Sequence, residues 1–388
     1  MTRHRILLVA ATLGLFALRA GAQVNIPETF ALPSSAADKG KPGFLWRVFQ
    51  NAADQQNNNQ KTEDALAGKL KDGDGNALAN EADPDAIGAA DAAGKKVGTA
   101  DNAIVEFEVS GVINFSQAAD ENNGNIRPDL QMPGIPGLTG STDGIAAEVL
   151  TWLDIPAGEH EIIVNSDDGF RLTMGGAAPK DQFATFVSEF NGGRGASDTS
   201  ARIRITKAGL YATRCTWEEG GGGANIELVQ VLPNGTRVAI NSPESTIKAY
   251  RAVTGATPVY ASLVTPPPGS TSAQFDTPIE VDLVGAAVTP ASVQLTVDGQ
   301  PVNATVNKSG DITSVRYTPP GRVDPRSRHA ISLAFDAGGP QTRNWEFTVV
   351  SYARLTASLK VTPDTSKPGF IWNVHQNEAF QANDNIRP

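Results

Sequence analysis

The sequence predicts an all-β protein built from two consecutive β-sandwiches, of which the second is the smaller. Short stretches of alternating apolar and polar residues follow one another at roughly 10-residue spacing from Asn102 onward. The 38 glycines and 25 prolines supply turn residues between these stretches. A Pro-rich segment at residues 264–271 separates the two series. Helix is expected only in short pieces.

Residues 1–22 have the pattern of a bacterial signal peptide. Two arginines precede an apolar run, and Ala20-Gly21-Ala22 forms a small-residue cleavage site. No later segment reaches the roughly 20 apolar residues that a spanning helix needs, so we expect no membrane insertion. The protein is therefore expected to be secreted or displayed on a bacterial cell surface. Its net charge of −10 argues against nucleic acid as a partner.

Residues 38–251 are expected to form the first sandwich. Its opening strand lies in KPGFLWRVFQN, where Phe44, Trp46 and Val48 alternate with more variable positions. The polar residues 51–101 then predict an irregular excursion with a short helix over Thr62–Leu70, capped by Thr62. The lone cysteine, Cys215, excludes an internal disulfide and is expected to be buried. Other expected core residues are Phe107, Leu172, Trp217 and, in the second sandwich, Phe347.

The second sandwich is expected over residues 272–350, after a linker at 264–271. Alternating stretches such as IEVDLVG and RNWEFTVV predict its strands, and Asp298-Gly299 is typical of a hairpin turn.

Residues 364–388 repeat residues 38–62 with 13 identities in 25 positions. Phe370, Trp372 and Val374 recur at the positions of Phe44, Trp46 and Val48, whereas the residues between them differ. The period of two indicates a strand whose conserved face packs into a core. Because the copy follows a complete sandwich, we interpret it as the first strand of a second, truncated module that can mediate self-association. The alternative is that it folds back onto the first sandwich.

The stretch EHEIIVNSDDGFRL places two adjacent carboxylates, Asp167 and Asp168, at a tight turn between strands. Their mutual repulsion must be offset by hydrogen bonds, by Arg171 or by a hard cation such as Ca²⁺. A solvated turn whose Asp side chains accept backbone N–H groups is the alternative.

NSDDGFRL, the preceding IPAGEHEI and the later TWEEGGGGANIEL together resemble the PA14 family of β-sandwich domains. The family's opening Gly-aromatic strand is similar to Pro42–Trp46, and the resemblance spans about residues 41–250. The second sandwich resembles a bacterial immunoglobulin-like module in SVQLTVDGQPV, VRYTPP and WEFTVV.

The PA14 resemblance implies a site. In the glycan-binding branch of the family, two aspartates joined by a cis peptide bond hold Ca²⁺, which in turn holds sugar hydroxyls. The matching residues here are Asp167 and Asp168, and Asn191 in FNGGRG is the candidate for a third ligand. These three residues are therefore the predicted calcium and ligand site.

A second calcium candidate, DGDGNALANEAD at residues 72–83, has Asp72, Asp74 and Asn76 at suitable positions. It has Ala77 where a helix–loop–helix site needs Gly, and Asp83 where it needs Glu, so a solvated acidic loop is favoured.

No nucleophile or metalloprotease motif occurs, and we expect no enzymatic activity. The sequence favours an exported carbohydrate-binding or adhesion module whose partner is a glycan or cell-surface polysaccharide. The alternatives are a structural spacer and a non-catalytic part of a secreted glycoside hydrolase or peptidase.

Overall fold

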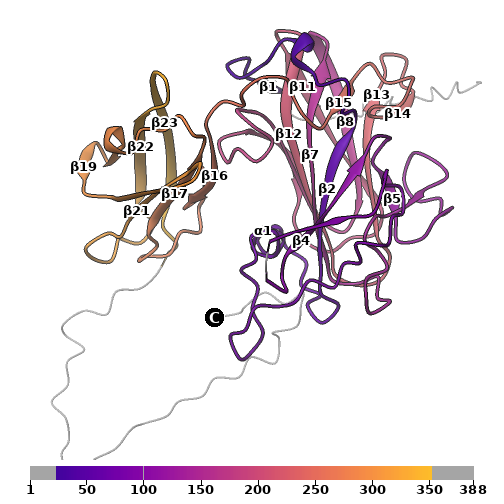
Figure 1. Cartoon of the computed structure of the whole chain (residues 1–388), viewed down its shortest axis with the longest axis horizontal. Coiled ribbons are helices and arrows are strands. Elements are labelled where there is room, and N and C mark those ends of the chain that lie inside the picture. Colours follow the sequence, from indigo (N-terminus) through magenta and orange to yellow (C-terminus); the bar gives the residue numbers. More distant parts are fainter. Residues whose placement is uncertain (1–22, 99, 352–388) are drawn as a thin grey trace, which may run out of the picture.

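The computed structural model describes residues 23–98 and 100–351, so the predicted signal peptide and the C-terminal repeat lie outside the described residues. Two β-sandwiches lie side by side (Figure 1). Within the described part, the helices are α1 (Asn59–Leu66) and two short 3₁₀ turns, Ser34–Ala36 and Pro290–Ser292. The all-β fold class is confirmed. No helix of the described residues is long and apolar enough to cross a membrane.

The first sandwich packs a seven-stranded sheet against an eight-stranded sheet. Most neighbours are antiparallel, but β1 is parallel to β11 and β5 to β6. The first sheet runs in the order β1-β11-β8-β13-β5-β6, with β14 beside β13: β1 (Val24–Ile26), β11 (Ser197–Ile205), β8 (Gly158–Asp167), β13 (Asn225–Val231), β5 (Asn114–Ser116), β6 (Leu130–Gln131) and β14 (Arg237–Ala239). The second runs β10-β9-β12-β7-β2-β4-β3, with β15 beside β7: β10 (Thr185–Phe190), β9 (Phe170–Gly176), β12 (Gly209–Glu219), β7 (Ile145–Ile155), β2 (Phe44–Gln50), β4 (Ile104–Val109), β3 (Lys95–Val97) and β15 (Lys248–Tyr250).

Aromatic side chains fill the space between these two sheets. Trp46 packs edge-on against Phe115 with ring centroids 5.3 Å apart, and the Trp217 ring centroid lies 6.1 Å from that of Trp46. The predicted burial is confirmed, since each of the six aromatic and leucine side chains named above is at most 6% exposed. Cys215 is buried as predicted, and burial raises the pKa of its thiol to about 12.

The opposite face of β2 is covered as well, which the repeat did not predict. Phe49 packs with Ala65 and Leu66 of α1. Arg47 is 9% exposed and forms ion pairs with Glu106 and the fully buried Glu148. Because Phe49 and Arg47 correspond to His375 and Asn373 in the repeat, the two copies differ at positions that are buried in the first sandwich.

The excursion at 51–101 is more ordered than predicted. Its helix begins at Asn59 and not at Thr62, because the Asn58 side chain caps it by accepting the Lys61 N–H at 2.8 Å. Asn80 anchors the segment to β2 by accepting from Gln50 N and donating to Val48 O. Residues 72–77 form an exposed turn in which Asp72 accepts the N–H groups of Asp74 and Asn76, whereas Asn80 and Ala82 further along the predicted calcium loop are buried.

The second sandwich consists of two four-stranded sheets with their own apolar core. The prediction of a linker at 264–271 is wrong at its start, because Val264 and Thr265 pair with β17 and Val264 is buried in that core. The immunoglobulin-like assignment stays a prediction. One sheet contains β16 (Tyr260–Thr265), β17 (Ile279–Val284), β21 (Ile312–Tyr317) and β20 (Thr305–Ser309), and the other contains β19 (Gln300–Val302), β18 (Gln294–Val297), β22 (Arg328–Asp336) and β23 (Pro340–Thr348).

Candidate functional site

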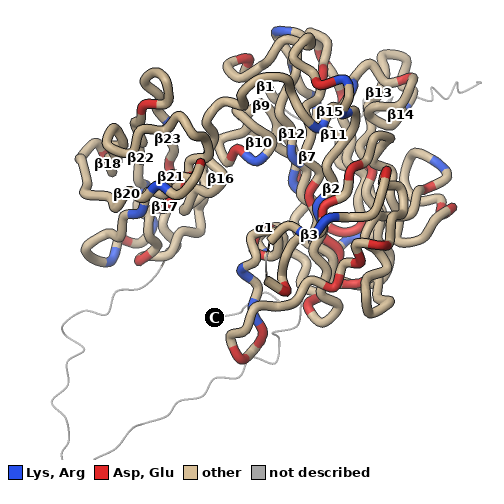
Figure 2. Tube along the Cα trace, in the orientation of Figure 1, with Lys and Arg blue, Asp and Glu red and all other residues tan. Residues whose placement is uncertain are grey.

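The Asp-Asp turn connects β8 to β9 at the end of the first sandwich near α1, where acidic side chains are frequent (Figure 2). The Asp167–Asp168 peptide bond is cis, as the family resemblance implies. The turn is bonded to β12 from both sides: Asp168 N donates to Glu218 O at 3.1 Å, and Glu218 N donates to Gly169 O at 2.9 Å. The indole N–H of Trp217 donates to Asp167 O at 3.1 Å. A buried tryptophan therefore fixes the backbone of the turn.

The Asp168 carboxylate holds two neighbouring loops. Its Oδ1 accepts the Arg194 N–H at 2.7 Å, and its Oδ2 accepts the Gly220 N–H at 3.1 Å. Arg194 belongs to the loop between β10 and β11, and Gly220 belongs to the loop between β12 and β13. Asp168 is only 6% exposed, so these bonds satisfy a carboxylate that would otherwise be costly to bury. The hydrogen-bonded turn considered as an alternative is thus present for Asp168.

Asp167 lies half-buried at the rim of the same turn. Burial and the neighbouring Asp168 charge raise the pKa of Asp167 to about 6, although Arg194 acts in the opposite direction. The Arg194 guanidinium donates to Ser166 O and Ser166 Oγ and lies over the Phe190 ring at 4.4 Å. Its position is fixed by these contacts, and it supplies a positive charge behind the Asp pair. No motif in the sequence marks Arg194 separately.

Two further carboxylates end β12 beside the pair, and both are fully buried. Glu218 Oε2 accepts the Thr62 hydroxyl at 3.0 Å, and burial raises the pKa of Glu218 to about 7. Neither oxygen of Glu219 has a hydrogen-bond partner. Burial, together with the charges of Asp143, Asp168 and Asp167, raises the pKa of Glu219 to about 8. A buried carboxylate without partners is rare in native proteins and requires an explanation.

One buried cation lies close to these glutamates. Lys61 on α1 is 4% exposed and donates to Asp54 O at 3.0 Å. Burial lowers the pKa of Lys61, whereas Glu218 and Glu219 act to raise it. Lys61 and Arg194 are two cations beside four carboxylates, those of Asp167, Asp168, Glu218 and Glu219, so ionisation of all four leaves an excess of negative charge.

The segment before α1 closes the site from the side. A Cβ atom on Gly220 would lie 2.6 Å from Gln55 O and 2.7 Å from the Asn57 side chain, so only glycine fits there. A Cβ on Gly193 would lie 3.2 Å from Asn57 Nδ2 and 3.5 Å from Asp168 Oδ1. The Asn57 amide therefore lies between the two loops that Asp168 holds, and its buried Oδ1 has no partner.

Residues of this segment also recur in the C-terminal repeat. Beyond the strand, the repeat preserves Gln55, Asn57 and Asn59 as Gln381, Asn383 and Asn385. In the structure these same residues contact the loops around the Asp pair. Their recurrence marks them as parts of the site and not of the strand.

Asn191 is placed differently from its predicted role. It lies in the expected loop, but its Oδ1 accepts the Asn59 N–H at 2.8 Å and so caps the start of α1. The loop reaches the Asp pair through the Arg194 N–H. Its role as a calcium ligand stays a prediction.

The residues around the pair fit a calcium ion only as a mixed set of oxygen ligands. Among the residues that the structure describes, no three His, Cys, Asp or Glu side chains are placed to hold a metal by themselves. The unpartnered oxygens of Glu219 and Asn57 and the half-buried carboxylate of Asp167 are, however, hard donors, and Glu219 lies close enough to Asp167 for their charges to interact. Ca²⁺ accepts such combinations of carboxylate and amide oxygens.

No family model matches the chain, and no curated protein is significantly similar to it in sequence. Several solved structures are similar. A PA14 sugar-binding domain from an RTX adhesin is 14% identical over 55% of this chain and 99% of that domain, with a TM-score of 0.33. The PA14 domain of the antifreeze protein MpAFP is 16% identical over 56% of this chain and 93% of that one, with a TM-score of 0.32. The epithelial adhesin 9 A domain from Candida glabrata, in complex with Galβ1-4GlcNAc, is 9% identical over 59% of this chain and 100% of that domain, with a TM-score of 0.32.

Proposed function

We propose that the protein is an exported, non-enzymatic carbohydrate-binding module that uses calcium at the Asp167–Asp168 turn. The observation that carries this proposal is the Glu219 carboxylate, which is fully buried and unpartnered beside the Asp pair. A cation at this end of the sandwich offsets the repulsion among these carboxylates. It also gives the unpaired oxygens partners.

The different surroundings of the two aspartates support the proposal. Asp168 is used by the protein itself, because both of its oxygens accept backbone N–H groups. Asp167 lies at the rim, where a bound ion remains open to an external ligand. Calcium keeps free coordination positions for neutral oxygens, and sugar hydroxyls are donors of that kind.

A glycan array tests this function. The labelled protein should bind some glycans only in millimolar Ca²⁺, and EGTA should remove this calcium-dependent binding. Asp168→Ala should abolish the binding, and Asp167→Asn, which preserves the side-chain volume at the rim, should weaken it.

Asp74→Asn provides a control, because Asp74 is an exposed acidic residue in the 72–83 loop. It should bind like the wild type. Circular dichroism of each variant separates loss of the site from loss of the fold. The proposal would be contradicted if no glycan on the array binds more tightly in calcium than in EGTA.

A further inference from the structure

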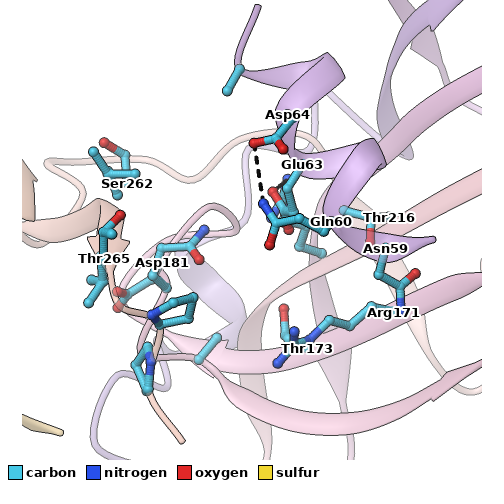
Figure 3. A pocket seen from close by; sticks show the side chains of 18 of the residues that line it. Asn59, Gln60, Glu63, Asp64, Arg171, Thr173, Asp181, Thr216, Ser262 and Thr265 are labelled. Carbon is cyan, nitrogen blue, oxygen red and sulfur yellow. Dashed lines mark hydrogen bonds and ion pairs between the residues drawn. The ribbon is translucent and has the colours of Figure 1, made fainter. Parts of the chain in front are cut away.

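A cavity lies between the two sandwiches (Figure 3). Its volume is about 560 Å³, which is within the range of small-ligand sites. α1 forms one wall, the outer surfaces of β9 and β12 form the floor, and β16 closes the side toward the second sandwich. Asp167, Asp168 and Glu219 do not line it.

The walls of this cavity are held at a fixed distance by contacts between the sandwiches. In the loop between β9 and β10, Gln182 N donates to Ala261 O at 2.8 Å. Asp181 Oδ1 accepts the Ala261 N–H at 3.3 Å. Phe183 packs edge-on against Trp345 of the second core, with ring centroids 5.6 Å apart. The cavity therefore depends on both sandwiches, and these contacts preform its shape.

Charges along the cavity balance. Three cationic side chains face three anionic ones, namely Lys69, Arg171 and Arg214 against Glu63, Asp64 and Asp181. Arg214 is fully paired, because its two terminal nitrogens donate to Glu63 at 2.7 and 2.9 Å and its Nε donates to Glu148 at 2.5 Å. A strongly charged ligand would find no excess of opposite charge here, so the lining suits a neutral one.

Hydrogen-bonding groups and one aromatic ring complete the lining. Thr216 is 2% exposed, yet its hydroxyl has no partner within the protein. The amide of Gln60 and the hydroxyl of Thr173 also lie along this cavity (Figure 3). Phe186 is 45% exposed, with the Arg171 guanidinium 5.6 Å from its ring centroid. Large apolar side chains left exposed in a concave polar setting are typical of ligand sites.

We propose that this cavity is a second, calcium-independent binding site for a short neutral oligosaccharide. A sugar ring presents hydroxyls at its edge and C–H groups on its face, and the lining offers amides and hydroxyls beside one exposed aromatic ring. The site does not depend on the Asp pair. A ligand there contacts both sandwiches. Its binding therefore depends on how the two sandwiches are arranged as well as on the hydrogen-bonding groups of the ligand.

The test is a glycan array measured in EGTA, which removes Ca²⁺ and so prevents binding at any calcium-dependent site. Neutral and sialylated oligosaccharides serve as probes for the wild type, Phe186→Ala, Thr216→Val and Asp168→Ala. We expect neutral oligosaccharides to bind in EGTA, with affinity reduced about tenfold in Phe186→Ala, which corresponds to about 1.4 kcal/mol. Thr216→Val should weaken binding as well, whereas Asp168→Ala should not change it.

Ile312→Ala is the matched control, because Ile312 is an equally exposed apolar residue (45%) outside the cavity. It should leave binding unchanged. The inference is overturned if no neutral oligosaccharide binds in EGTA, if only sialylated probes bind, or if Phe186→Ala binds as tightly as the wild type. Loss of binding in EGTA together with loss in Asp168→Ala would support the calcium site and remove this second one.

Discussion

Single residues decide how the Asp-Asp turn is supported. Trp217 belongs to the core through its ring and to the site through its indole N–H, which donates to Asp167 O at 3.1 Å. The sequence analysis predicts that this tryptophan is buried. It did not predict the hydrogen bond, because the partner lies 50 residues away and is a backbone oxygen.

Trp217→Ala should lower the free energy of unfolding by about 3–5 kcal/mol, because it removes a fully buried ring from a core that cannot collapse around the gap. Trp217→Phe keeps most of the packing but loses the hydrogen bond, so it should cost less stability while still weakening calcium binding. Urea titration measures the stability of both variants, and calorimetric titration with Ca²⁺ measures the calcium binding. A loss below roughly 1 kcal/mol for Trp217→Ala would show that the ring does not support the core.

The raised pKa values predict an unusual dependence of stability on pH. Glu219 has a pKa of about 8 and Glu218 of about 7 in the folded protein, against an ordinary value of 4.5. The folded protein therefore binds these protons more tightly than the unfolded chain does. The contribution of these two groups to stability is greatest below about pH 4.5, and it is lost as the pH rises through 7 and 8.

Without calcium, the midpoint of thermal unfolding should therefore fall between pH 5 and pH 8, and millimolar Ca²⁺ should remove much of that fall. Glu219→Gln should flatten the dependence, because the amide does not ionise. Thermal unfolding followed across this pH range in EGTA and in Ca²⁺ gives the answer. A midpoint that rises steadily toward pH 8 in EGTA would contradict the assignment of buried, unpaired carboxylates.

At the scale of elements, sequence patterns located the strands and the turn but not the loops that surround it. Periodicity identifies a strand because one face is buried, and the Asp-Asp-Gly turn is local in sequence. Arg194 and Gly220, by contrast, reach Asp168 across 26 and 52 residues. The sequence predicts a helix that begins at Thr62, whereas α1 begins at Asn59, because Asn58 and not Thr62 provides its N-terminal cap.

Asn191 and Asn58 together satisfy the first N–H groups of α1. Asn191→Ala removes one of these acceptors and should cost about 1 kcal/mol of stability, since losing an N-terminal cap typically costs that much. Calcium affinity should change by less than about threefold. Asn191→Asp retains an acceptor and serves as the control. A loss of calcium affinity of tenfold or more in Asn191→Ala, with stability unchanged, would make Asn191 a ligand as the family resemblance implies.

For the whole molecule, two sandwiches joined by a packed contact were only partly predictable. The strand patterns and the Pro-rich segment predict two all-β units, but the predicted connection at 264–271 overlaps the last two residues of strand β16. The docking of Phe183 against Trp345 depends on a loop of the first sandwich entering the second core, and no local pattern signals such a contact. The cavity between the sandwiches was not predicted for the same reason.

The repeat at 364–388 stays a prediction, because it lies outside the described residues. In the first sandwich the corresponding strand is central, between β7 and β4, so its place is already filled. Deleting residues 364–388 should therefore change the melting temperature by only a few degrees and reduce self-association in analytical ultracentrifugation. A large fall in melting temperature would show that the segment belongs to the first sandwich.

Calorimetric titration of the protein with Ca²⁺ tests the central claim most directly. The wild type should bind about one ion at millimolar or tighter affinity and release protons near pH 7, because the raised pKa values leave Glu219 and Glu218 partly protonated there. Asp168→Ala should lose this heat, whereas Asp74→Asn should retain it. No heat for the wild type, or the same heat after Asp168→Ala, would contradict a calcium-assisted site at the Asp167–Asp168 turn.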